Sequence, residues 1–375
     1  YGYQMYVPGQ YTNPNLTWET NTQFNLAVDL GFKRKDNKGV NLTIDGYYKK
    51  NKDLLLKQEL PLYVAQNNWL CIASSYVNAG SIQNAGFDVQ LSALLIKKEI
   101  KDKTFSWDSE LTFSLVRSKV LDLGAACEAI YDKSDARGPY RLMTSDIQIN
   151  KSVVDEAPGK FWGYTVEGVI KDEKQAAKYN KETGRSANVG DLMFSKDMTW
   201  IGDPNPDFTA GWSNTFAYGP WSLNVQFNSS YGNDVFNLVR MKLEAMNGDV
   251  KYFNQSKEVL NHAVVEKNSK GQLVVRNNTE LPTPSKDDAN GNCKTVSDRY
   301  VEDGSYLRLQ NVGVTYTFDN KVNEKLHISG LHVTAGCQNV CTITGYSGYD
   351  PENPGSAIRQ GVDEARYPTP RTYQF

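Results

Sequence analysis

Several features of common protein classes are absent from this 375-residue sequence. No apolar run approaches the ~20 residues that a transmembrane helix needs, which excludes a helical membrane protein. Lys and Arg number 41 and Asp and Glu number 43, so the chain lacks the basic excess that marks nucleic-acid-binding proteins. We therefore expect no nucleic-acid partner.

Histidine and cysteine are also scarce. The three histidines, His262, His327 and His332, form no HExxH or HxH pattern. The five cysteines form no CxxC pair and are odd in number, which argues against a zinc site or a disulfide framework. A bridge between Cys337 and Cys341 across a turn stays open. Because no nucleophile elbow, phosphate-binding glycine loop or Ser/His/Asp constellation is visible, we expect no catalytic residues, no cofactor and no enzyme activity.

Two local patterns have the spacing of known sites. Residues 203–207 (DPNPD) bring carboxylates together, but Pro and Asn in this arrangement are first of all turn residues. Asp288, Asn290 and Asn292 have the 1, 3, 5 spacing of a calcium loop, but Cys293 stands where glycine is needed and no Glu follows at the twelfth position. We expect a turn at the first place and no metal at the second.

The dominant signal is alternation of apolar and polar residues. In residues 18–32 the even positions are apolar or Thr, whereas the odd positions are mostly polar. Such a period of two predicts β-strands. Strands are expected at 18–32, 40–56, 78–97, 104–121, 207–217, 221–231, 304–318, 325–340 and in a last segment ending at Phe375. Residues 146–170 add strand pairing that the pattern does not place, and a phase slip near Gly330 indicates a bulge.

The lengths of the strands and of their connections are typical of an outer-membrane β-barrel. The strands run about 12 to 17 residues, whereas strands of globular proteins average ~5 to 6. Short turns at 33–39, 97–103, 218–220 and 319–325 alternate with long, polar, irregular links at about 57–77, 122–156, 232–303 and 341–368. Within the third link, residues 236–263 have the apolar spacing of a short helix. We expect the long links outside the cell and the short turns in the periplasm.

Aromatic residues gather beside the short turns, where an interfacial girdle of a barrel lies. They are Phe32, Phe105, Trp107, Tyr218, Trp221 and Phe318. Rings that cap the core of a soluble sheet are the alternative for each cluster alone, but their common place beside the turns favours the barrel.

The number of expected strands is odd, whereas complete bacterial barrels have an even number. The sequence also begins at Tyr1 without an initiator Met or the regions of a signal peptide. We therefore expect an internal piece of a longer chain rather than a mature start after a cleaved signal.

Eight stretches, in order along the chain, resemble SusC-like (SusC/RagA-type) TonB-dependent transporters of the Bacteroidetes outer membrane. They are NPNLTWE (13–19), YYKKNKDLL (47–55), NAGSIQNAGF (78–87), IGDPNPDF (201–208), SYGNDVFN (230–237), SDRYVEDGSYLRL (297–309), TGYSGYDPE (344–352) and YPTPRTY (367–373). The resemblance implies an all-β transmembrane antiparallel β-barrel with long extracellular loops. Residues 1–375 would be the C-terminal part of a 22-stranded barrel domain, about 9–11 strands, with the plug domain and the N-terminal strands outside this chain.

The resemblance also implies a function and partners. It implies energised import of a large nutrient, an oligosaccharide or in some members an oligopeptide, across a Gram-negative outer membrane. The implied partners are a SusD-like surface lipoprotein as lid, TonB acting through the N-terminal part, that part of its own barrel, and outer-membrane lipid, with a dimer of SusC–SusD pairs. Two alternatives stay open, a passive, structural or adhesion barrel and a surface glycan-binding β protein.

Aromatic rings in the long loops are candidates for stacking on sugar faces. They are Trp69, Tyr76, Tyr346 and Tyr349. Loop packing is the alternative for each of them. The sequence does not decide whether the solute is a glycan or a peptide, and the resemblance to the family favours a glycan.

Overall fold

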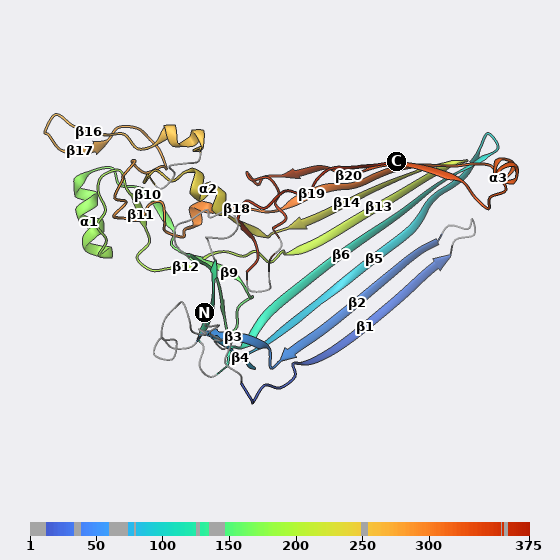
Figure 1. The fold of residues 1–375 in the computed structure, drawn as a ribbon, viewed down its shortest axis with the longest axis horizontal. Helices are drawn as coiled ribbons and strands as arrows, with labels where there is room; N and C mark the ends of the chain where they lie inside the picture. Colours follow the sequence, from blue (N-terminus) through green and yellow to red (C-terminus); the bar gives the residue numbers. More distant parts are fainter. Residues whose placement is uncertain are drawn as a thin grey trace, which may run out of the picture.

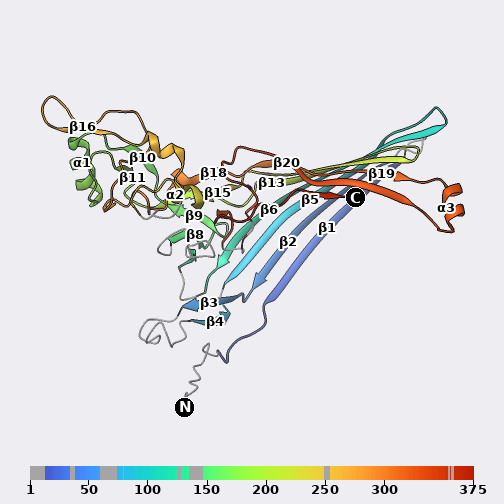
Figure 2. The ribbon, with the colours of Figure 1, turned by 45° about the horizontal axis from the view of Figure 1, so that its top comes forward.

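The computed structural model describes residues 13–33, 39–59, 74–78, 80–124, 128–134, 147–248, 254–353, 355 and 359–375. A sheet of long antiparallel strands forms one part of the molecule, and an assembly of loops lies at one end of these strands (Figures 1 and 2).

The described residues form one nine-stranded antiparallel sheet in the order β1-β2-β5-β6-β13-β14-β19-β20-β22. Its strands are β1 (Thr20–Lys33), β2 (Gly39–Lys52), β5 (Ser81–Ile100), β6 (Lys103–Asp122), β13 (Phe208–Tyr218), β14 (Trp221–Tyr231), β19 (Tyr306–Thr317), β20 (His332–Thr344) and β22 (Thr372–Gln374). Each predicted strand has its counterpart here. All neighbours in this sheet pair antiparallel.

One face of the sheet, called the outer face below, is apolar and open to the surroundings. On β1, Phe24 and Leu26 are 68 and 66 % exposed and alternate with polar residues. Because paired residues of neighbouring strands share a face, apolar rows cross the sheet. One such row is Leu30, Leu42, Leu91, Leu111, Trp212 and Phe227. The opposite, inner face is polar. Among the described residues, no helix is both long and apolar enough to cross a membrane.

Aromatic residues beside the short turns of β6, β13, β14 and β19 form a row on the outer face. Phe105 pairs with Tyr218, Tyr218 with Trp221, and Trp221 with Tyr316. The rings of Trp221 and Tyr316 lie 4.8 Å apart between centroids, and Phe318 lies 4.9 Å from Tyr316. The row has the position expected of an interfacial girdle.

Three details of the predicted strands are wrong. The predicted strand at 40–56 is interrupted at Asp53, whose φ of 57° turns the chain, so that β2 ends at Lys52 and β3 (Leu55–Glu59) begins a separate hairpin with β4 (Ser74–Asn78). The predicted strand at 325–340 starts later, because α3 (Asn320–Leu326) precedes it and ends at His327 in the left-handed region. The bulge lies at Asn339, with φ of 52°, and not near Gly330.

Where the structure describes the long links, they contain helices and paired strands. A four-stranded sheet in the order β12-β9-β8-β7 and a two-stranded sheet of β10 and β11 account for the unplaced pairing at 146–170. The elements of the links are β7 (Ala129–Ser134), β8 (Ile147–Val153), β9 (Lys160–Gly163), β10 (Val166–Val169), α1 (Glu173–Thr183), β11 (Leu192–Phe194), β12 (Thr199–Gly202), β15 (Asp234–Asn237), α2 (Leu238–Leu243), η1 (Lys257–Asn261), β16 (Val265–Lys267), β17 (Leu273–Val275), η2 (Asp298–Tyr300), β18 (Val301–Asp303) and β21 (Val362–Asp363). The predicted short helix within 236–263 is confirmed as α2.

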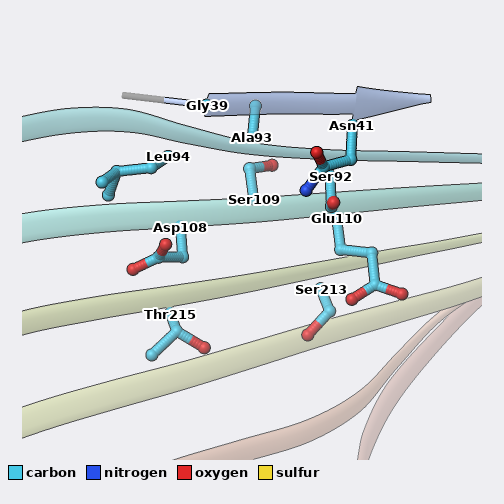
Figure 3. A pocket seen from close by; sticks show the side chains of 10 residues that line it. All are labelled: Gly39, Asn41, Ser92, Ala93, Leu94, Asp108, Ser109, Glu110, Ser213 and Thr215. Atoms are coloured by element: carbon cyan, nitrogen blue, oxygen red, sulfur yellow. The ribbon is translucent and has the colours of Figure 1, made fainter. Parts of the chain in front are cut away.

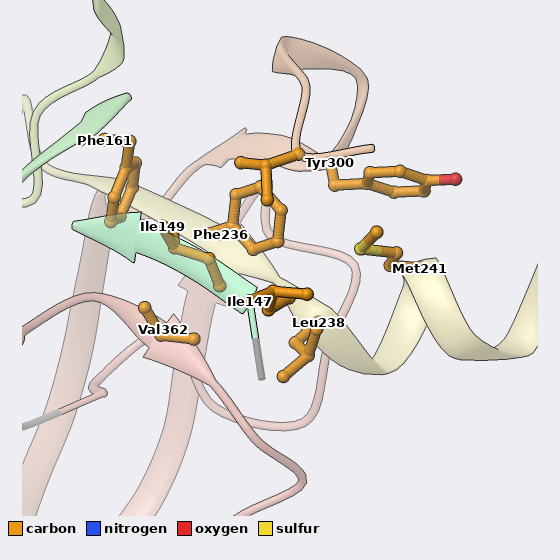
Figure 4. Packing of buried hydrophobic residues seen from close by; sticks show 9 residues of the cluster. Ile147, Ile149, Phe161, Phe236, Leu238, Met241, Tyr300 and Val362 are labelled. Atoms are coloured by element: carbon orange, nitrogen blue, oxygen red, sulfur yellow. The ribbon is translucent and has the colours of Figure 1, made fainter. Parts of the chain in front are cut away.

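Among the described residues, the largest cluster of buried apolar side chains lies in this loop assembly and not against the long sheet. Figure 4 shows the side chains of Ile149, Phe161, Phe236, Leu238 and Tyr300 packed together from four separate stretches of sequence. All five are at most 2 % exposed. Such burial holds the loops in a defined arrangement, since a large buried side chain contributes about 1.5–3 kcal/mol relative to an exposed one.

Candidate functional site

The inner face of the long sheet forms a polar wall with two hollows. The hollow near the turn end has a volume of about 370 Å³, and Figure 3 shows Asp108, Glu110, Ser213 and Thr215 among its lining side chains. The second hollow, of about 660 Å³, lies farther along the same strands and includes Asp88 in its lining. The wall is therefore hollowed and rich in hydrogen-bonding groups.

Carboxylates dominate the charge of this wall and are held by neighbouring hydroxyl and amide groups. The hydroxyl of Thr43 donates to Asp29 at 2.6 Å, and the amide of Gln90 donates to Glu110 at 2.7 Å. The hydroxyl of Ser114 donates to Asp88. These contacts fix the carboxylates without neutralising them, so the wall attracts neutral or cationic groups more readily than polyanions.

A separate cavity, the loop pocket, opens in the loop assembly and has a volume of about 620 Å³. Its lining residues come from β15, α2, η1 and the residues that flank the two helices, and from β18, β21 and the segment after β20. They are Asn237, Val239, Arg240, Leu243, Glu244, Ser256, Glu258, Glu302, Ser347, Gly348, Tyr349 and Asp363. Four of these side chains are acidic and only Arg240 is basic, so the pocket combines a net acidic wall with hydroxyl and amide groups.

An ion network fixes the floor of the loop pocket. Arg240 Nε lies 2.8 Å from Glu244 Oε1, and its Nη1 lies 3.1 Å from Glu302 Oε1. Arg299 Nη2 lies 2.5 Å from Glu244 Oε2. Glu302 also accepts hydrogen bonds from the backbone N–H and the hydroxyl of Ser347, at 2.9 and 3.0 Å.

These contacts determine the protonation of the network. Burial alone raises the pKa of Glu302, but the hydrogen bonds from Ser347 and the charge of Arg240 outweigh it and hold the pKa below its usual value. The pKa of Arg240 is raised because Glu244 and Glu302 more than offset its burial. Both side chains are therefore charged at neutral pH, and the floor of the pocket is a rigid, paired surface.

The predicted aromatic ligand residues have different environments. Tyr349 is 81 % exposed and lines the loop pocket. Tyr346 is only 6 % exposed, and its hydroxyl donates to Asp363 Oδ2 at 2.6 Å. Burial, together with this carboxylate, raises the pKa of Tyr346. Its ring has no free face for a sugar in this arrangement, which favours the packing alternative. Tyr76 is 39 % exposed in the β3–β4 hairpin, away from the pocket lining, and Trp69 lies outside the described residues.

The predicted turn at 203–207 is confirmed. Asp203 Oδ1 accepts from the backbone N–H of Asn205 at 2.9 Å, as in an Asx turn.

At the calcium-like spacing, the polar side chains form hydrogen bonds with the protein itself, within the loop and with residues around Leu192. Both oxygens of Asp288 accept backbone N–H groups, from Asn292 at 2.7 Å and Cys293 at 3.1 Å. The amide of Asn290 donates to the carbonyl of Leu192 at 2.8 Å. Within the described part of the chain, no group of three or more His, Cys, Asp or Glu side chains is placed to hold a metal ion.

Cys337 and Cys341 are free thiols, so the bridge that the sequence left open is not formed. They lie four residues apart on one strand, β20.

Residues 1–340 match the family described as TonB dependent receptor-like, beta-barrel. This chain belongs to that family. The all-β barrel class predicted from the alternation is therefore confirmed, and so is the resemblance to SusC-like receptors. The family consists of outer-membrane receptors and transporters and not of enzymes, which confirms the expectation that the chain is not an enzyme.

Individual relatives of the chain come from Bacteroidetes-type bacteria. It is similar to TonB-dependent receptor P3 of Formosa agariphila, with 27 % identity over 97 % of this chain and 34 % of that protein. It is also similar to TonB-dependent receptor SusC of Bacteroides thetaiotaomicron, with 24 % identity over 96 % of this chain and 32 % of that protein. The chain thus spans about a third of the length of the curated relatives that it matches.

Among solved structures, the chain is similar in fold to the RagAB peptide transporter. The TM-score is 0.68 at 21 % identity, over 97 % of this chain and 35 % of that chain. The closed-closed state of the RagAB peptide importer gives a TM-score of 0.66 at 22 % identity. This likeness supports the barrel fold of the family.

Sequence reasoning missed the loop pocket and its ion network. One local signal was available, since Arg240 and Glu244 are four residues apart in a segment with helical spacing, where such side chains are neighbours. Nothing local indicated that Glu302 and Asp363 lie beside them, because these residues are 62 and 123 positions away from Arg240 in the sequence.

Proposed function

We propose that the protein imports a large nutrient, an oligosaccharide or an oligopeptide, across the outer membrane in a TonB-dependent manner. The observation that carries the proposal is the pairing of an apolar outer face with a polar, hollowed inner face on the strands of a TonB-dependent receptor family member. Lipid on one side and a wet passage on the other is the arrangement of a transport barrel.

Further strands of the same protein would close the barrel. β1 is a 14-residue strand at one edge of the nine-stranded sheet, and its free backbone groups would be costly to leave unpaired in lipid. The N-terminal part of the protein would supply these strands, the plug and the contact with TonB.

The loop pocket is the proposed contact point for solute on the outer side. Tyr349 offers an exposed ring, and Ser347, Asn237 and the surrounding carboxylates offer hydrogen-bonding partners. An apolar face rimmed by hydroxyl-binding groups suits a sugar ring, whereas the acidic wall also suits the amino groups of a peptide. The resemblance to SusC-like receptors favours a glycan, whereas the similarity in fold to the RagAB peptide transporter favours a peptide.

A SusD-like lipoprotein would cover the loop assembly as a lid, and two such pairs would form a dimer. The support is the similarity to SusC and to RagAB together with the folded state of the loops. A surface with its own buried core is rigid enough to present a stable docking face. Tyr76 and Trp69 keep their proposed role as further aromatic contacts.

Growth tests the proposal. Cells that lack the gene would be grown on single oligosaccharides or peptides as sole nutrient, alongside wild-type cells with and without TonB. Growth on one solute class that requires both the gene and TonB is expected. Uptake that needs the gene but persists without TonB would instead favour a passive pore, and no uptake phenotype at all would favour a structural, adhesion or glycan-binding role.

The role of Tyr349 has a matched control. Tyr349→Ala should weaken solute binding by about fivefold, which is roughly 1 kcal/mol. Tyr367→Ala removes a ring of similar exposure, 86 %, that does not line the pocket. Equal affinities of the two variants would show that the pocket ring does not contact solute.

A further inference from the structure

Basic side chains lie on the outer face of the sheet, just beyond its apolar band. Along β6 the outer-face positions run from Phe105 through Leu115 to Arg117 and Lys119. The ten-residue step from Phe105 to Leu115 is about 33 Å along the strand, or about 25 Å along the membrane normal for a strand tilted by about 40°. This equals the height of the apolar band of outer-membrane barrels, so Arg117 and Lys119 fall at the level of the lipid headgroups.

The same level carries cations on β2, which is separated from β6 by β5 alone. The strand register gives the outer-face row Thr22, Lys50, Gln83 and Lys119. The row directly below it contains Phe24, Tyr48, Ala85 and Arg117, with the rings of Phe24 and Tyr48 68 and 39 % exposed. Lys52 continues the outer face of β2 by one further position. We call Lys50, Lys52, Arg117 and Lys119 the outer basic patch.

The patch is confined to one part of the sheet. At the loop ends of β14, β19 and β20, the outer-face residues are Tyr231, Leu307 and Ile343, which are 56, 43 and 68 % exposed. These positions are aromatic or aliphatic. Lysines that serve only to place their charges in water at the membrane surface would occur on every strand. The clustering of basic residues on β2 and β6 therefore indicates a local binding surface.

The charges of the patch are accessible to an anion. Lys119 and Asp155 pair at 2.8 Å, and their side chains are 43 and 76 % exposed. Arg117 and Asp207 pair at 2.9 Å, and theirs are 55 and 60 % exposed. Exposed pairs of this kind contribute little and exchange partners readily. The described residues give neither Lys50 nor Lys52 an ion-pair partner.

We propose that the outer basic patch binds the phosphate-bearing headgroup of a lipid in the external leaflet. Two strand spacings of about 4.8 Å separate Lys50 from Lys119, so their ammonium groups can converge on one headgroup. The rings of Phe24 and Tyr48 lie below it, where they contact the acyl chains. Basic clusters beside a membrane attract anionic headgroups in this way, and salt screens the attraction.

The test uses the full-length protein in detergent micelles with a trace of a diphosphorylated glycolipid of the lipid A type, and, in a second arm, the same lipid after dephosphorylation. Native mass spectrometry counts the bound lipid. Lys50→Gln combined with Lys119→Gln should bind the phosphorylated lipid about 25-fold less tightly than the wild type, roughly fivefold for each charge. Added salt should reduce the difference.

Two further variants separate a contact with the lipid phosphate from a general effect of charge. Lys49→Gln removes the same charge from the neighbouring position, which lies on the inner face in the row Gln23, Lys49, Asn84 and Ser118, and should bind as the wild type does. Asp155→Asn frees Lys119 and should bind more tightly, by roughly two- to fivefold. Asn tolerates the φ of 73° at this position, and unchanged heat-modifiable migration checks the fold of each variant.

The outcome that would overturn the proposal is equal binding by the double variant and by Lys49→Gln. Equal retention of the dephosphorylated lipid would overturn it as well, because the apolar band alone would then explain the binding.

Discussion

Replacing Arg308 with Met should loosen the segment that forms one wall of the loop pocket. Arg308 lies on β19, and its guanidinium holds the segment after β20 through two carboxylates. Nη1 donates to Glu352 at 2.7 Å and Nη2 to Asp350 at 2.5 Å, while Nε donates to Thr342 Oγ1 at 3.0 Å. This segment carries Tyr349, so the position of the exposed ring depends on the Arg308 contacts.

The size of the effect follows from burial. The side chains of Arg308 and Asp350 are only 5 and 15 % exposed, whereas that of Glu352 is 51 % exposed. Removing one partner of a buried pair costs about 3–5 kcal/mol, because the other charge is left uncompensated. Since Glu352 can rehydrate, we expect the lower end of this range, about 3 kcal/mol, for the local opening of residues 345–353.

Hydrogen exchange on the full-length protein measures this opening directly. A loss of about 3 kcal/mol corresponds to exchange roughly 150-fold faster in the backbone amides of the segment. Adding Asp350→Asn to the Arg308→Met variant should recover part of the protection from exchange, because the buried carboxylate that Arg308 no longer neutralises is then removed.

A matched control comes from the exposed pair on the same sheet. Arg117→Met breaks the contact with Asp207, whose side chain is 60 % exposed, and exposed pairs contribute about 0–1 kcal/mol. Exchange near Asp207 should therefore change by no more than about fivefold. If Arg308→Met changed the exchange of residues 345–353 no more than this control changes its own site, the reasoning from burial would be refuted.

Three further predictions concern other parts of the molecule. Trp107→Phe removes the indole N–H that donates to Asn214 at 3.0 Å. Because Asn214 is only 3 % exposed, the free energy of unfolding should fall by about 1–3 kcal/mol, which is measured as a lower temperature for the heat-modifiable shift. Because the pKa of Glu302 is lower in the folded protein than its unfolded value near 4.5, Glu302 stabilises the fold above that pH, and this stabilisation is lost as the pH falls from there through the folded pKa. Acid should therefore speed hydrogen exchange in the pocket floor less in Glu302→Gln than in the wild type, and an identical acid response would contradict this. An epitope inserted after Ser269, in the β16–β17 turn, should be labelled on intact cells, whereas one inserted after Lys101, in the β5–β6 turn, should not. The reverse labelling would contradict the prediction that the long loops lie outside the cell.

The long sheet could be predicted from the sequence because one local signal encodes both strand and face. A period of two marks a strand, and the same alternation separates the outer apolar residues from the inner polar ones. The prediction failed only where a single residue changes the backbone direction. Asp53 ends β2 and His327 ends α3, both in the left-handed region, and a hydrophobicity pattern does not contain that information.

The loop assembly was not predictable in the same way. Its main core joins Ile149, Phe161, Phe236, Tyr300 and Val362, which are separated by up to 213 residues in the sequence. Each link alone shows a few apolar residues among many polar ones and has the composition of an irregular loop. Only the pairing of distant segments, such as β15 with both β18 and β21, brings these residues into contact.

Two tyrosines illustrate what this means for the candidate site. Tyr346 and Tyr349 are three residues apart and carry the same chemical signal for ligand stacking, yet they are 6 and 81 % exposed. The difference arises because the parallel pairing of β21 with β15 places Asp363 where it accepts the hydroxyl of Tyr346, while no such partner holds Tyr349 among the described residues. Whether an aromatic ring in these loops is exposed or packs inside is thus decided by long-range strand pairing and not by the residues next to it in the sequence.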